Sequence, residues 1–409
     1  MLKAARQASI EASQISSETK KKILLEAARG LIKNSKAILR ENQKDIAGAR
    51  RGGLSSAMID RLTLTGKRIK EMAEGLKTVA ALPDPVGRVE SSWRRPNGLK
   101  ISRVRVPIGV ILIIYESRPN VTVECASLCL KSGNAVILRG GREAFYSNRA
   151  LVSIFEKVLA RHHLPKACVN FVQTTDRSAV DFLLKREGDI HLVIPRGGEA
   201  LIRKVAHTSR IPVIKHYQGI CHVYVDKKAN LKKALAITFN AKLQRPGVCN
   251  AMETLLVHRE IAPRFLPLAG AQLQKGGCEI RADKFSRRFI RGAKAAGPRD
   301  FGHEFLDKIL AVKTVPDLDH AIRHIQDFGS AHTDAIVTED RRAAETFKQK
   351  VDSSSVMVNA STRFSDGFQY GFGAEIGIST DKIHARGPMG LEGRTSHKDV
   401  VEGKGQIRT

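Results

Sequence analysis

Short β-branched apolar runs alternate with longer helix-like segments through the first half of the chain, and this alternation constrains the fold more than any other feature. The run from Val106 to Ile114 suits a strand that is buried on both faces. The alternation continues with helices near 119–132 and 147–161 and with strands near 135–138, 169–172 and 189–194. Strands that alternate with helices predict a parallel, doubly wound α/β sheet.

Two of the predicted strands end in the same tripeptide, Arg139-Gly140-Gly141 and Arg196-Gly197-Gly198. Paired glycines let backbone N–H groups approach an anion at the start of the next helix, and the arginine adds a charged donor. Doubly wound sheets bind their ligands at the carboxyl ends of the strands. We therefore predict that both tripeptides bind cofactor phosphate. A tight strand-to-helix turn that needs no ligand is the alternative for either one.

A cysteine in the second half of the chain lies in a Pro/Gly turn between a helix-like segment and a strand-like one. The turn reads Gln244-Arg245-Pro246-Gly247-Val248-Cys249-Asn250, and a mostly apolar run from Met252 to Val257 follows it. Such a loop presents sulfur to a cleft and suits a nucleophile. The alternative is a small buried hydrophobe, which a free cysteine usually is. The other cysteines show no spacing typical of metal ligands, so we expect no metal site.

The formal net charge of +28 makes a nucleic-acid-binding protein the hypothesis from another functional class. The Lys and Arg residues are spread along the chain, however, and only 5% of the residues are aromatic, which leaves little surface for stacking single-stranded bases. We favour a solvated basic surface around a site for phosphate-bearing ligands, with no specific nucleic acid as a partner. The size of the charge excess has no explanation in the sequence.

Eight further segments agree with the Cys249 turn in pointing to one family. They are residues 106–110, 115–122, 131–141, 194–198, 219–226, 332–336, 358–364 and 383–390. Taken in this order, with the Cys249 turn as the strongest match, they resemble the gamma-glutamyl phosphate reductase family of the aldehyde dehydrogenase superfamily. The resemblance covers essentially the whole chain.

This resemblance implies an aldehyde dehydrogenase-like α/β fold with a doubly wound, parallel-sheet cofactor domain, a second α/β catalytic domain and a small β region for oligomerisation. We expect the cofactor domain at 1–228, interrupted by a hairpin at 84–105, and the catalytic domain at 229–394. The hairpin and residues 395–409 would form the oligomerisation region. The implied reaction is the NADPH-dependent reduction of L-glutamyl 5-phosphate to L-glutamate 5-semialdehyde with release of phosphate, a step of proline biosynthesis.

The resemblance also implies roles for single residues. Cys249 would attack the acyl phosphate and form a thioester, and Asn120 would donate to the oxyanion, unless it only caps the following helix. Glu375 would approach the nicotinamide ribose of the cofactor. The residues expected to bind substrate are Arg118, Arg245, Asn250, Ser361, Thr362 and Arg363.

An absent carboxylate predicts the fate of the thioester. Hydrolytic aldehyde dehydrogenases carry a glutamate that activates water, within a segment before a strand like 221–225. Here residues 214–220 contain no carboxylate, so we expect phosphate, rather than water, to attack the thioester when the reaction runs in reverse. His216 in this segment is the alternative base, because the unperturbed imidazole pKa of about 6.5 suits proton abstraction.

The resemblance implies a homo-oligomer, a dimer or higher, and functional coupling to a glutamate 5-kinase. Another acylating aldehyde dehydrogenase with a different acyl donor is the alternative within the same class. The longest apolar stretch is far too short to span a bilayer, and the N-terminus lacks the apolar core of a secretory signal. We therefore predict a cytoplasmic enzyme with no membrane partner.

Overall fold

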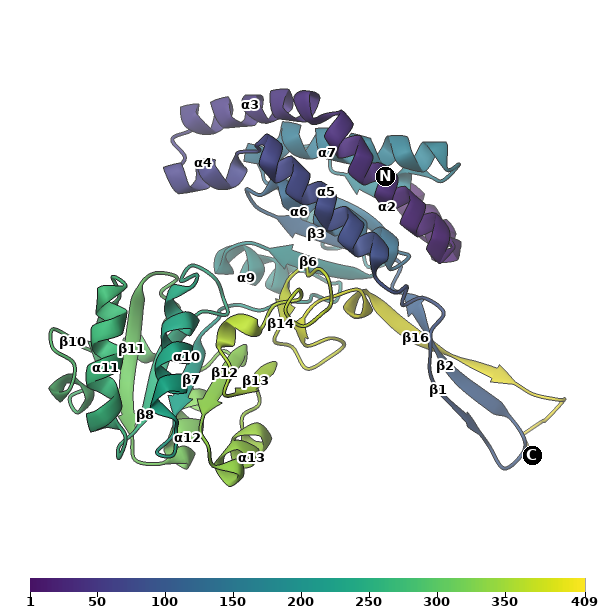
Figure 1. Cartoon of the computed structure of the whole chain (residues 1–409). Coiled ribbons are helices and arrows are strands. Elements are labelled where there is room, and N and C mark those ends of the chain that lie inside the picture. Colours follow the sequence, from purple (N-terminus) through teal and green to yellow (C-terminus); the bar gives the residue numbers. More distant parts are fainter. Residues whose placement is uncertain (409) are drawn as a thin grey trace. The chain divides into compact units, whose positions relative to one another are not determined.

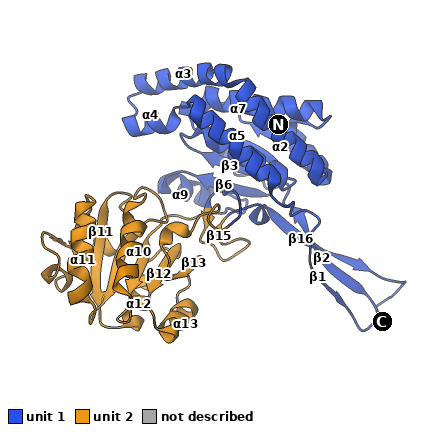
Figure 2. Ribbon diagram, viewed as in Figure 1, with its two compact units in different colours: residues 1–215, 371–377, 389–409 blue, residues 216–370, 378–388 orange. Residues whose placement is uncertain are grey.

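A computed structural model describes residues 1–408 and divides the chain into two compact units. Unit 1 comprises residues 1–215, 371–377 and 389–409, and unit 2 comprises residues 216–370 and 378–388 (Figure 2). Each unit contains a parallel sheet with helices, and this confirms the predicted α/β class.

The sheet of unit 1 has four parallel strands in the order β5-β4-β3-β6. Their bounds are β3 (Val110–Tyr115), β4 (Ala135–Arg139), β5 (Val169–Phe171) and β6 (Leu192–Arg196). The chain runs outward from β3 to β5 and then returns to the other side of β3. In doubly wound sheets, ligands bind where the strand order reverses in this way, at the carboxyl ends of the strands.

The helices of unit 1 cover both faces of this sheet. Alternate residues of β3, namely Val110, Leu112 and Ile114, pack in one core with apolar residues of α1, α8 and α9. Helices α6 and α7 contact β3, β4 and β5 (Figure 1). The helices are α1 (Leu2–Gln14), α2 (Ser17–Lys33), α3 (Ser35–Arg51), α4 (Ser56–Leu62), α5 (Gly66–Ala81), α6 (Pro119–Lys131), α7 (Phe145–Arg161), α8 (Ser178–Leu183) and α9 (Glu199–Thr208), with short 3-10 turns η1 (Arg142–Ala144) and η2 (Lys166–Cys168).

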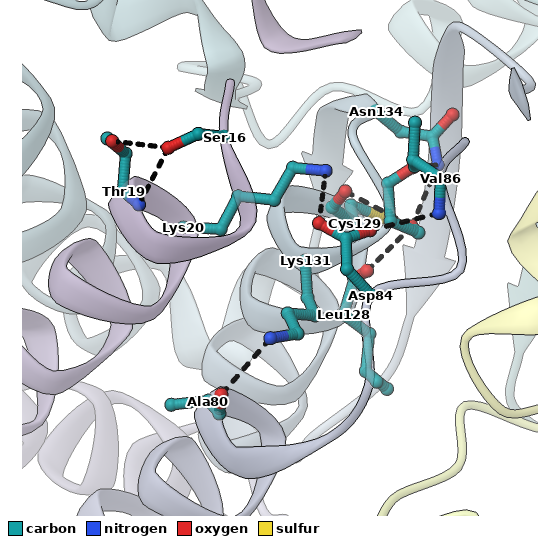
Figure 3. Close-up of polar contacts among 11 residues, drawn as sticks. Ser16, Thr19, Lys20, Ala80, Asp84, Val86, Leu128, Cys129, Lys131 and Asn134 are labelled. Atoms are coloured by element: carbon teal, nitrogen blue, oxygen red, sulfur yellow. Dashed lines mark hydrogen bonds and ion pairs between the residues drawn. The ribbon is translucent and has the colours of Figure 1, made fainter. Parts of the chain in front are cut away.

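A buried ion pair fixes the segment that leaves α5. Nζ of Lys20, whose side chain is 1% exposed, lies 2.9 Å from Oδ2 of Asp84, and Oδ1 of Asp84 accepts a hydrogen bond from the N–H of Val86 (Figure 3). Nearby, the buried Lys131 donates to the carbonyl oxygen of Ala80 at the end of α5. The chain is thus held on both sides of the Pro83–Pro85 break before the hairpin begins.

The predicted hairpin forms, and the C-terminal strand pairs with it. Strands β1 (Val89–Arg94) and β2 (Lys100–Pro107) are antiparallel, and β16 (Thr395–Glu402) pairs with β2 over its whole length. Ion pairs Lys100–Glu402 and Arg103–Asp399 cross this register at 2.9 and 3.0 Å. The polar residues of β16 therefore support its pairing.

One predicted strand is two strands in the structure. The run from Val106 to Ile114 was expected to be continuous, but β2 ends at Pro107 and β3 begins at Val110. Proline lacks the N–H that a ladder needs, and Gly109 has a φ of 122°, which a side chain would disfavour. The chain therefore changes sheets at this point.

The sheet of unit 2 has seven parallel strands in the order β10-β9-β11-β8-β7-β12-β13. Their bounds are β7 (Cys221–Val225), β8 (Met252–His258), β9 (Glu279–Ala282), β10 (Lys294–Ala295), β11 (Ile309–Val315), β12 (Thr333–Val337) and β13 (Ser355–Val358). A further two-stranded sheet joins β14 (Ile378–Ser379) to β15 (Gly387–Pro388).

Helices also cover both faces of the sheet of unit 2. One core packs α10 and α11 on residues such as Leu255 and Val257, and the other packs α12 and α13 on Tyr224, Leu256 and Ile336. The helices are α10 (Leu231–Leu243), α11 (Ala262–Lys275), α12 (Leu318–Phe328) and α13 (Arg341–Lys350), with 3-10 turns η3 (Ser286–Arg288), η4 (Pro298–Gly302) and η5 (Thr362–Phe364); η6 (Glu392–Arg394) belongs to unit 1. Among residues 1–408, no helix combines the length and the apolar character that crossing a bilayer requires.

The division of the chain differs from the predicted domains 1–228 and 229–394. The strand Cys221–Val225, expected in the first domain, pairs with β8 and β12 in the sheet of unit 2. The first unit therefore ends at 215. Residues 371–377 and 389–409 then return to it, because the last part of the chain contributes β16 to the sheet of the hairpin.

Candidate active site

The turn that carries Cys249 is clamped at both ends by a buried ion pair. Helix α10 ends at Leu243 and strand β8 begins at Met252, so the turn spans the residues between them. Nζ of Lys242 lies 2.6 Å from Oε2 of Glu253, and both side chains are 0% exposed. Oε1 of Glu253 accepts from the N–H of Leu306. Two charges buried in this way are stable only as a pair, so the two ends of the turn are held together.

The backbone of Cys249 lies directly against Gly219. A Cβ atom on Gly219 would come within 1.9 Å of the carbonyl oxygen of Cys249, so only glycine fits there. The N–H of Gly219 donates to Oε1 of Glu304. Cys249 itself is partly exposed, whereas all the other cysteines are buried. Cys249 is therefore not packed into the core as the other cysteines are, and its role as the nucleophile stays a prediction.

Two imidazoles surround this thiol. Ligand atoms of His216, Cys249 and His332 all lie within 4.8 Å of one another. Nδ1 of His216 lies 2.9 Å from the carbonyl oxygen of Ile378, so Nδ1 carries the proton and a neutral ring keeps its lone pair on Nε2. Burial, with a smaller contribution from His216, lowers the pKa of His332 to about 3, so that ring is neutral near pH 7.

Cys221 lies beside the cluster but differs from Cys249 in its surroundings. Its Sγ donates to the carbonyl oxygen of Cys249 at 3.2 Å and lies 3.7 Å from Nδ1 of His332. Complete burial raises the pKa of the Cys221 thiol well above its ordinary value. A thiol that resists ionisation is a poor nucleophile.

All these groups lie at the amino ends of the strands of unit 2. Cys221 opens β7, the turn of Cys249 precedes β8, and His332 precedes β12. Neighbouring strands thus bring together residues that are far apart in the sequence. Sequence reasoning considered His216 only as a base for water and missed His332, because no local pattern connects a histidine before one strand to a cysteine before another.

The predicted cluster 361–363 lies beside the Cys249 turn. Nδ2 of the buried Asn250 donates to the carbonyl oxygen of Ser365 at 2.8 Å, and Nε of Arg363 donates to Oε1 of Gln244. Burial lowers the pKa of Arg363, and the next influences on it are the charges of Arg245, Asp366 and Cys249. The guanidinium thus contacts the Cys249 turn through Gln244.

Two of the predicted substrate ligands in this cluster, Ser361 and Thr362, differ in their contacts. Oγ of Ser361 accepts from the N–H of Arg363 and so caps the 3-10 turn η5. Oγ1 of Thr362 is buried and has no hydrogen-bond partner within residues 1–408. Arg245, at the start of the turn, is exposed.

A small cavity of about 250 Å³ opens next to Arg363. It is lined by Asn240, Gln244, Arg363, Phe364, Asp366 and Gln369. Oδ1 of Asp366 accepts a hydrogen bond from the N–H of Phe368, and this bond fixes the Asp366 carboxylate. The cavity lining therefore contains a carboxylate as well as the guanidinium of Arg363. A cation and an anion in one small cavity suit a ligand that carries both charges, and sequence reasoning did not single out Asp366.

In unit 1, both Arg-Gly-Gly turns follow strands that flank β3, and each has a carboxylate of the protein against its glycines. The N–H of Gly198, the N-cap residue of α9, donates to Oε2 of Glu116 at 3.0 Å. A Cβ on Gly141 would come within 2.0 Å of Oε1 of Glu143, and this oxygen accepts from the N–H and Oγ of Ser117. The helix start at Gly198 thus already binds an anionic oxygen.

The two arginines of these turns differ. The guanidinium of Arg139 is buried and donates to the carbonyl oxygens of Gly140, Thr175 and Asp176. The side chain of Arg196 is half-buried, and a Cβ on Gly377 would come within 3.2 Å of its Nη1. Arg196 is therefore beside residues 371–377, the segment that contains Glu375.

Asn120 and Arg118 lie at the start of α6 in the same unit. Arg118 is the exposed N-cap residue, and Nδ2 of Asn120 donates to Oε1 of Glu124 at 2.8 Å. Burial raises the pKa of Glu124, and the hydrogen bond from Asn120 and the charges of Arg196 and Arg118 oppose this shift. The structure thus assembles Arg118, Asn120 and Arg196 around one carboxyl group.

Comparisons with known proteins agree with this geometry. A sequence model of the aldehyde dehydrogenase family matches residues 1–281. A gamma-glutamyl phosphate reductase of Carboxydothermus hydrogenoformans is 56% identical over 408 residues, which cover 100% of this chain and 98% of the relative.

Solved structures extend the comparison. The crystal structure of a gamma-glutamyl phosphate reductase from Thermotoga maritima matches with a TM-score of 0.98 at 46% identity and covers 100% of this chain and 99% of its own. An acetylating aldehyde dehydrogenase from Geobacillus thermoglucosidasius shares the fold, with a TM-score of 0.70 at 18% identity, over 100% of this chain and 96% of its own.

Proposed function

The chain belongs to the gamma-glutamyl phosphate reductases of the aldehyde dehydrogenase family, and from that premise we propose how its own residues carry out the reaction. The enzyme reduces L-glutamyl 5-phosphate to L-glutamate 5-semialdehyde and releases phosphate, with NADPH as the reductant, as a step of proline biosynthesis. The observation that carries the proposal is the partly exposed Cys249, held in a clamped turn between two imidazoles.

Substrate binding uses the cavity at Arg363. The guanidinium of Arg363 donates hydrogen bonds to the α-carboxylate of the glutamyl group, for which its fork of donors is suited. Asp366 on the same wall accepts the α-ammonium group. Since Arg363 contacts Gln244 of the Cys249 turn, a substrate anchored there directs its side chain toward Cys249. Ser361 contributes by capping the 3-10 turn that carries Arg363, and Thr362 contributes its buried hydroxyl in the same turn.

Acyl transfer begins when the thiolate of Cys249 attacks the carbonyl carbon of the acyl phosphate. The new C–S bond forms as the C–O bond to phosphate breaks, and phosphate leaves with the electron pair. His216, whose Nε2 keeps a lone pair while its Nδ1 proton bonds to the carbonyl oxygen of Ile378, takes the thiol proton, whereas His332 is too weak a base. Arg245 and Arg118 are the candidate partners of the phosphate group, and Asn120 and the N–H of Cys249 or Asn250 are candidate donors to the oxyanion.

The residues around β3 fit a nicotinamide dinucleotide. The N–H of Gly198 already binds a carboxylate oxygen, so a phosphate oxygen suits the same donor. Residues 139–141 and 196–198 would hold the phosphates, and Glu375, on the segment beside Arg196, would hold the ribose. When bound, NADPH supplies the hydride that brings the acyl group to the aldehyde level.

Phosphate, and not water, releases the acyl group when the reaction runs backward. In residues 214–220 the candidate base is His216, and its Nδ1 proton is committed to the carbonyl oxygen of Ile378. A ring nitrogen of His216 lies within 4.8 Å of the thiol of Cys249, so this imidazole serves proton exchange with the thiol. No carboxylate in this segment activates water against the thioester.

The assembly and location of the enzyme belong to the same proposal. The sheet β1-β2-β16 provides the surface through which copies of the chain associate as a dimer or higher oligomer. We place the enzyme in the cytoplasm, in functional coupling with a glutamate 5-kinase that supplies the labile acyl phosphate. Specific nucleic-acid binding is not part of this function, and the basic surface attracts phosphate-bearing ligands instead.

The test is the reverse reaction, the oxidation of glutamate 5-semialdehyde with NADP⁺, followed by NADPH absorbance. We expect absorbance to rise only when inorganic phosphate is present, with glutamyl phosphate as the product. Steady NADPH production in buffer free of phosphate and arsenate would contradict the proposal, because water would then be the acceptor. No activity with or without phosphate would contradict the assigned substrate.

A further inference from the structure

We propose that Cys249, His216 and His332 form a binding site for a soft divalent cation such as Zn²⁺, and that the bound cation reversibly blocks the nucleophile. The sequence predicted no metal site, because the three residues are far apart in the chain and show no ligand spacing. The fold brings one sulfur and two nitrogen atoms within 4.8 Å of one another. The inference rests on the site of the proposed function.

The geometry is close to that of a tetrahedral metal site. Zinc binds sulfur at about 2.3 Å and imidazole nitrogen at about 2.0–2.1 Å, so neighbouring donors around it are about 3.3–3.7 Å apart. Donors within 4.8 Å therefore need to draw together by only about 1 Å. Catalytic zinc sites have the same arrangement, with three protein ligands and a fourth position open to water.

Both histidines are prepared to bind a cation. Nδ1 of His216 donates to the carbonyl oxygen of Ile378, and metal-bound histidines are oriented by a hydrogen bond of this kind from the other ring nitrogen. His332 is 0% exposed, and its Nε2 has no hydrogen-bond partner within residues 1–408. A neutral, buried imidazole with an unpartnered nitrogen gains a ligand without losing an existing bond.

The donor set selects the class of cation. One thiolate and two imidazoles suit Zn²⁺, Cd²⁺ or Co²⁺, whereas Mg²⁺ and Ca²⁺ prefer oxygen ligands. Arg363 and Arg245 add positive charge nearby. Their repulsion disfavours cations that bind by charge alone and leaves those that bind sulfur and nitrogen strongly. On binding, the thiol loses its proton to solvent and the metal–sulfur bond replaces the S–H bond, with no change of oxidation state.

The experiment uses the purified full-length enzyme, stripped with a chelator and titrated with Co²⁺. We expect one Co²⁺ per chain, with the thiolate charge-transfer band and the intense visible bands of tetrahedral cobalt, and displacement of Co²⁺ by Zn²⁺. Zn²⁺ should inhibit turnover and protect Cys249 from iodoacetamide, and the chelator should reverse both effects. The proposed function needs no metal, so the enzyme should be active after the chelator has removed metal. Inactivity of this metal-free enzyme would contradict the proposed function and not the metal site.

Substitutions identify the ligands. Cys249→Ala should abolish the charge-transfer band, and His216→Ala and His332→Ala should each weaken Co²⁺ binding at least about tenfold. His320→Ala removes an exposed histidine of the same unit and should change nothing. His332 is buried, so His332→Ala can misfold. If it does, Co²⁺ binding by His216→Ala alone tests whether the histidines are ligands. Co²⁺ binding unchanged in a folded His216→Ala variant, or no tetrahedral spectrum in the unmodified enzyme, would overturn the proposal.

Discussion

The Arg-Gly-Gly turns of unit 1 and the Cys249 turn of unit 2 lie at opposite ends of parallel strands. The former follow β4 and β6, at the carboxyl ends, and the latter precedes β8, at the amino end. The general rule for doubly wound sheets, that ligands bind at the carboxyl ends of the strands, agrees with the position of the Arg-Gly-Gly turns but not with that of the Cys249 turn. In unit 1 the backbone N–H groups of helix starts and turns attract anions. In unit 2 the amino ends of neighbouring strands bring side chains together around a thiol.

The groups that face the turns differ as well. Glycines of unit 1 lie against the carboxylates Glu116 and Glu143, whereas the thiol of unit 2 lies beside the imidazoles of His216 and His332. An anion site that is already filled by the protein's own carboxylate must exchange it for the ligand. A thiol with an imidazole such as His216 beside it has a base already in place. We therefore expect the anion site of unit 1 to rearrange when a ligand binds, whereas the groups around Cys249 in unit 2 are already in place.

The largest expected effect concerns the thiol. Cys249→Ala should abolish reduction of glutamyl phosphate, because no other cysteine is partly exposed beside two imidazoles. Cys278→Ala and Cys221→Ala should keep most of the activity, since both side chains are buried and the Cys221 thiol resists ionisation. Steady-state rates with glutamyl phosphate and NADPH measure this. Comparable activity in the Cys249 variant would contradict the assignment of the nucleophile.

Each unit contains a buried lysine–carboxylate pair, and breaking either tests whether the two regions differ in function. Glu253→Gln leaves Lys242 without its anion, and Asp84→Asn leaves Lys20 in the same state. Loss of one partner of a buried pair costs about 3–5 kcal/mol of unfolding free energy. Urea titration should therefore show a large loss in both variants.

Activity should distinguish the two variants. Glu253 clamps the turn of Cys249, so Glu253→Gln should lower kcat at a temperature where the protein is still folded. Asp84 clamps the segment before the hairpin in the other unit, so Asp84→Asn should leave kcat nearly unchanged under the same conditions. An equal loss of kcat in both variants would mean that the Lys242–Glu253 pair has no special role in positioning the nucleophile.

The sequence predicted the elements that depend on local pattern. The buried strands β3 and β4 and the partial exposure of Cys249 follow from residues adjacent in the chain. It did not predict which groups face one another across strands. His332, Asp366, Glu116 and the Lys242–Glu253 pair come from separate segments, and without pairing information a single sequence does not bring them together. The misplaced boundary at 228 has the same cause, because β7 was assigned by its order in the chain and not by its partners.

Acidification should destabilise unit 2 through its buried histidines. Burial lowers the pKa of His324 to about 3, with smaller contributions from His222 and Lys313, and that of His332 to about 3. The unfolded chain takes up a proton near pH 6.5 and the folded chain does not, so stability is lost as pH falls from about 6.5 toward 3. At pH 5 each of these histidines should cost about 2 kcal/mol.

Urea titrations at pH 7 and pH 5 measure this loss. His324→Phe fills the same space among Phe301 and Phe328 and removes one titrating group, so its pH dependence should be shallower than that of the unmodified chain. His320→Phe, at an exposed histidine, should keep the full dependence. Equal slopes in the unmodified chain and in His324→Phe would show that His324 does not titrate differently on folding.

The smallest expected effect tests whether the anion site of unit 1 must give up its own carboxylate. Oε2 of Glu116 accepts from the N–H of Gly198, where cofactor phosphate is proposed to bind. Glu116→Gln keeps an oxygen that can accept this bond but removes the negative charge that repels phosphate. Because Glu116 is exposed, the gain should be only about 0.5–1 kcal/mol, which corresponds to a KM for NADPH lower by about two- to fivefold. Glu187→Gln makes the same change of net charge in the loop before β6, at the amino end of the sheet, and should leave KM unaltered. If Glu116→Gln raises KM instead, the carboxylate helps to bind the cofactor. The anion site of unit 1 would then need no rearrangement, like the groups around Cys249 in unit 2.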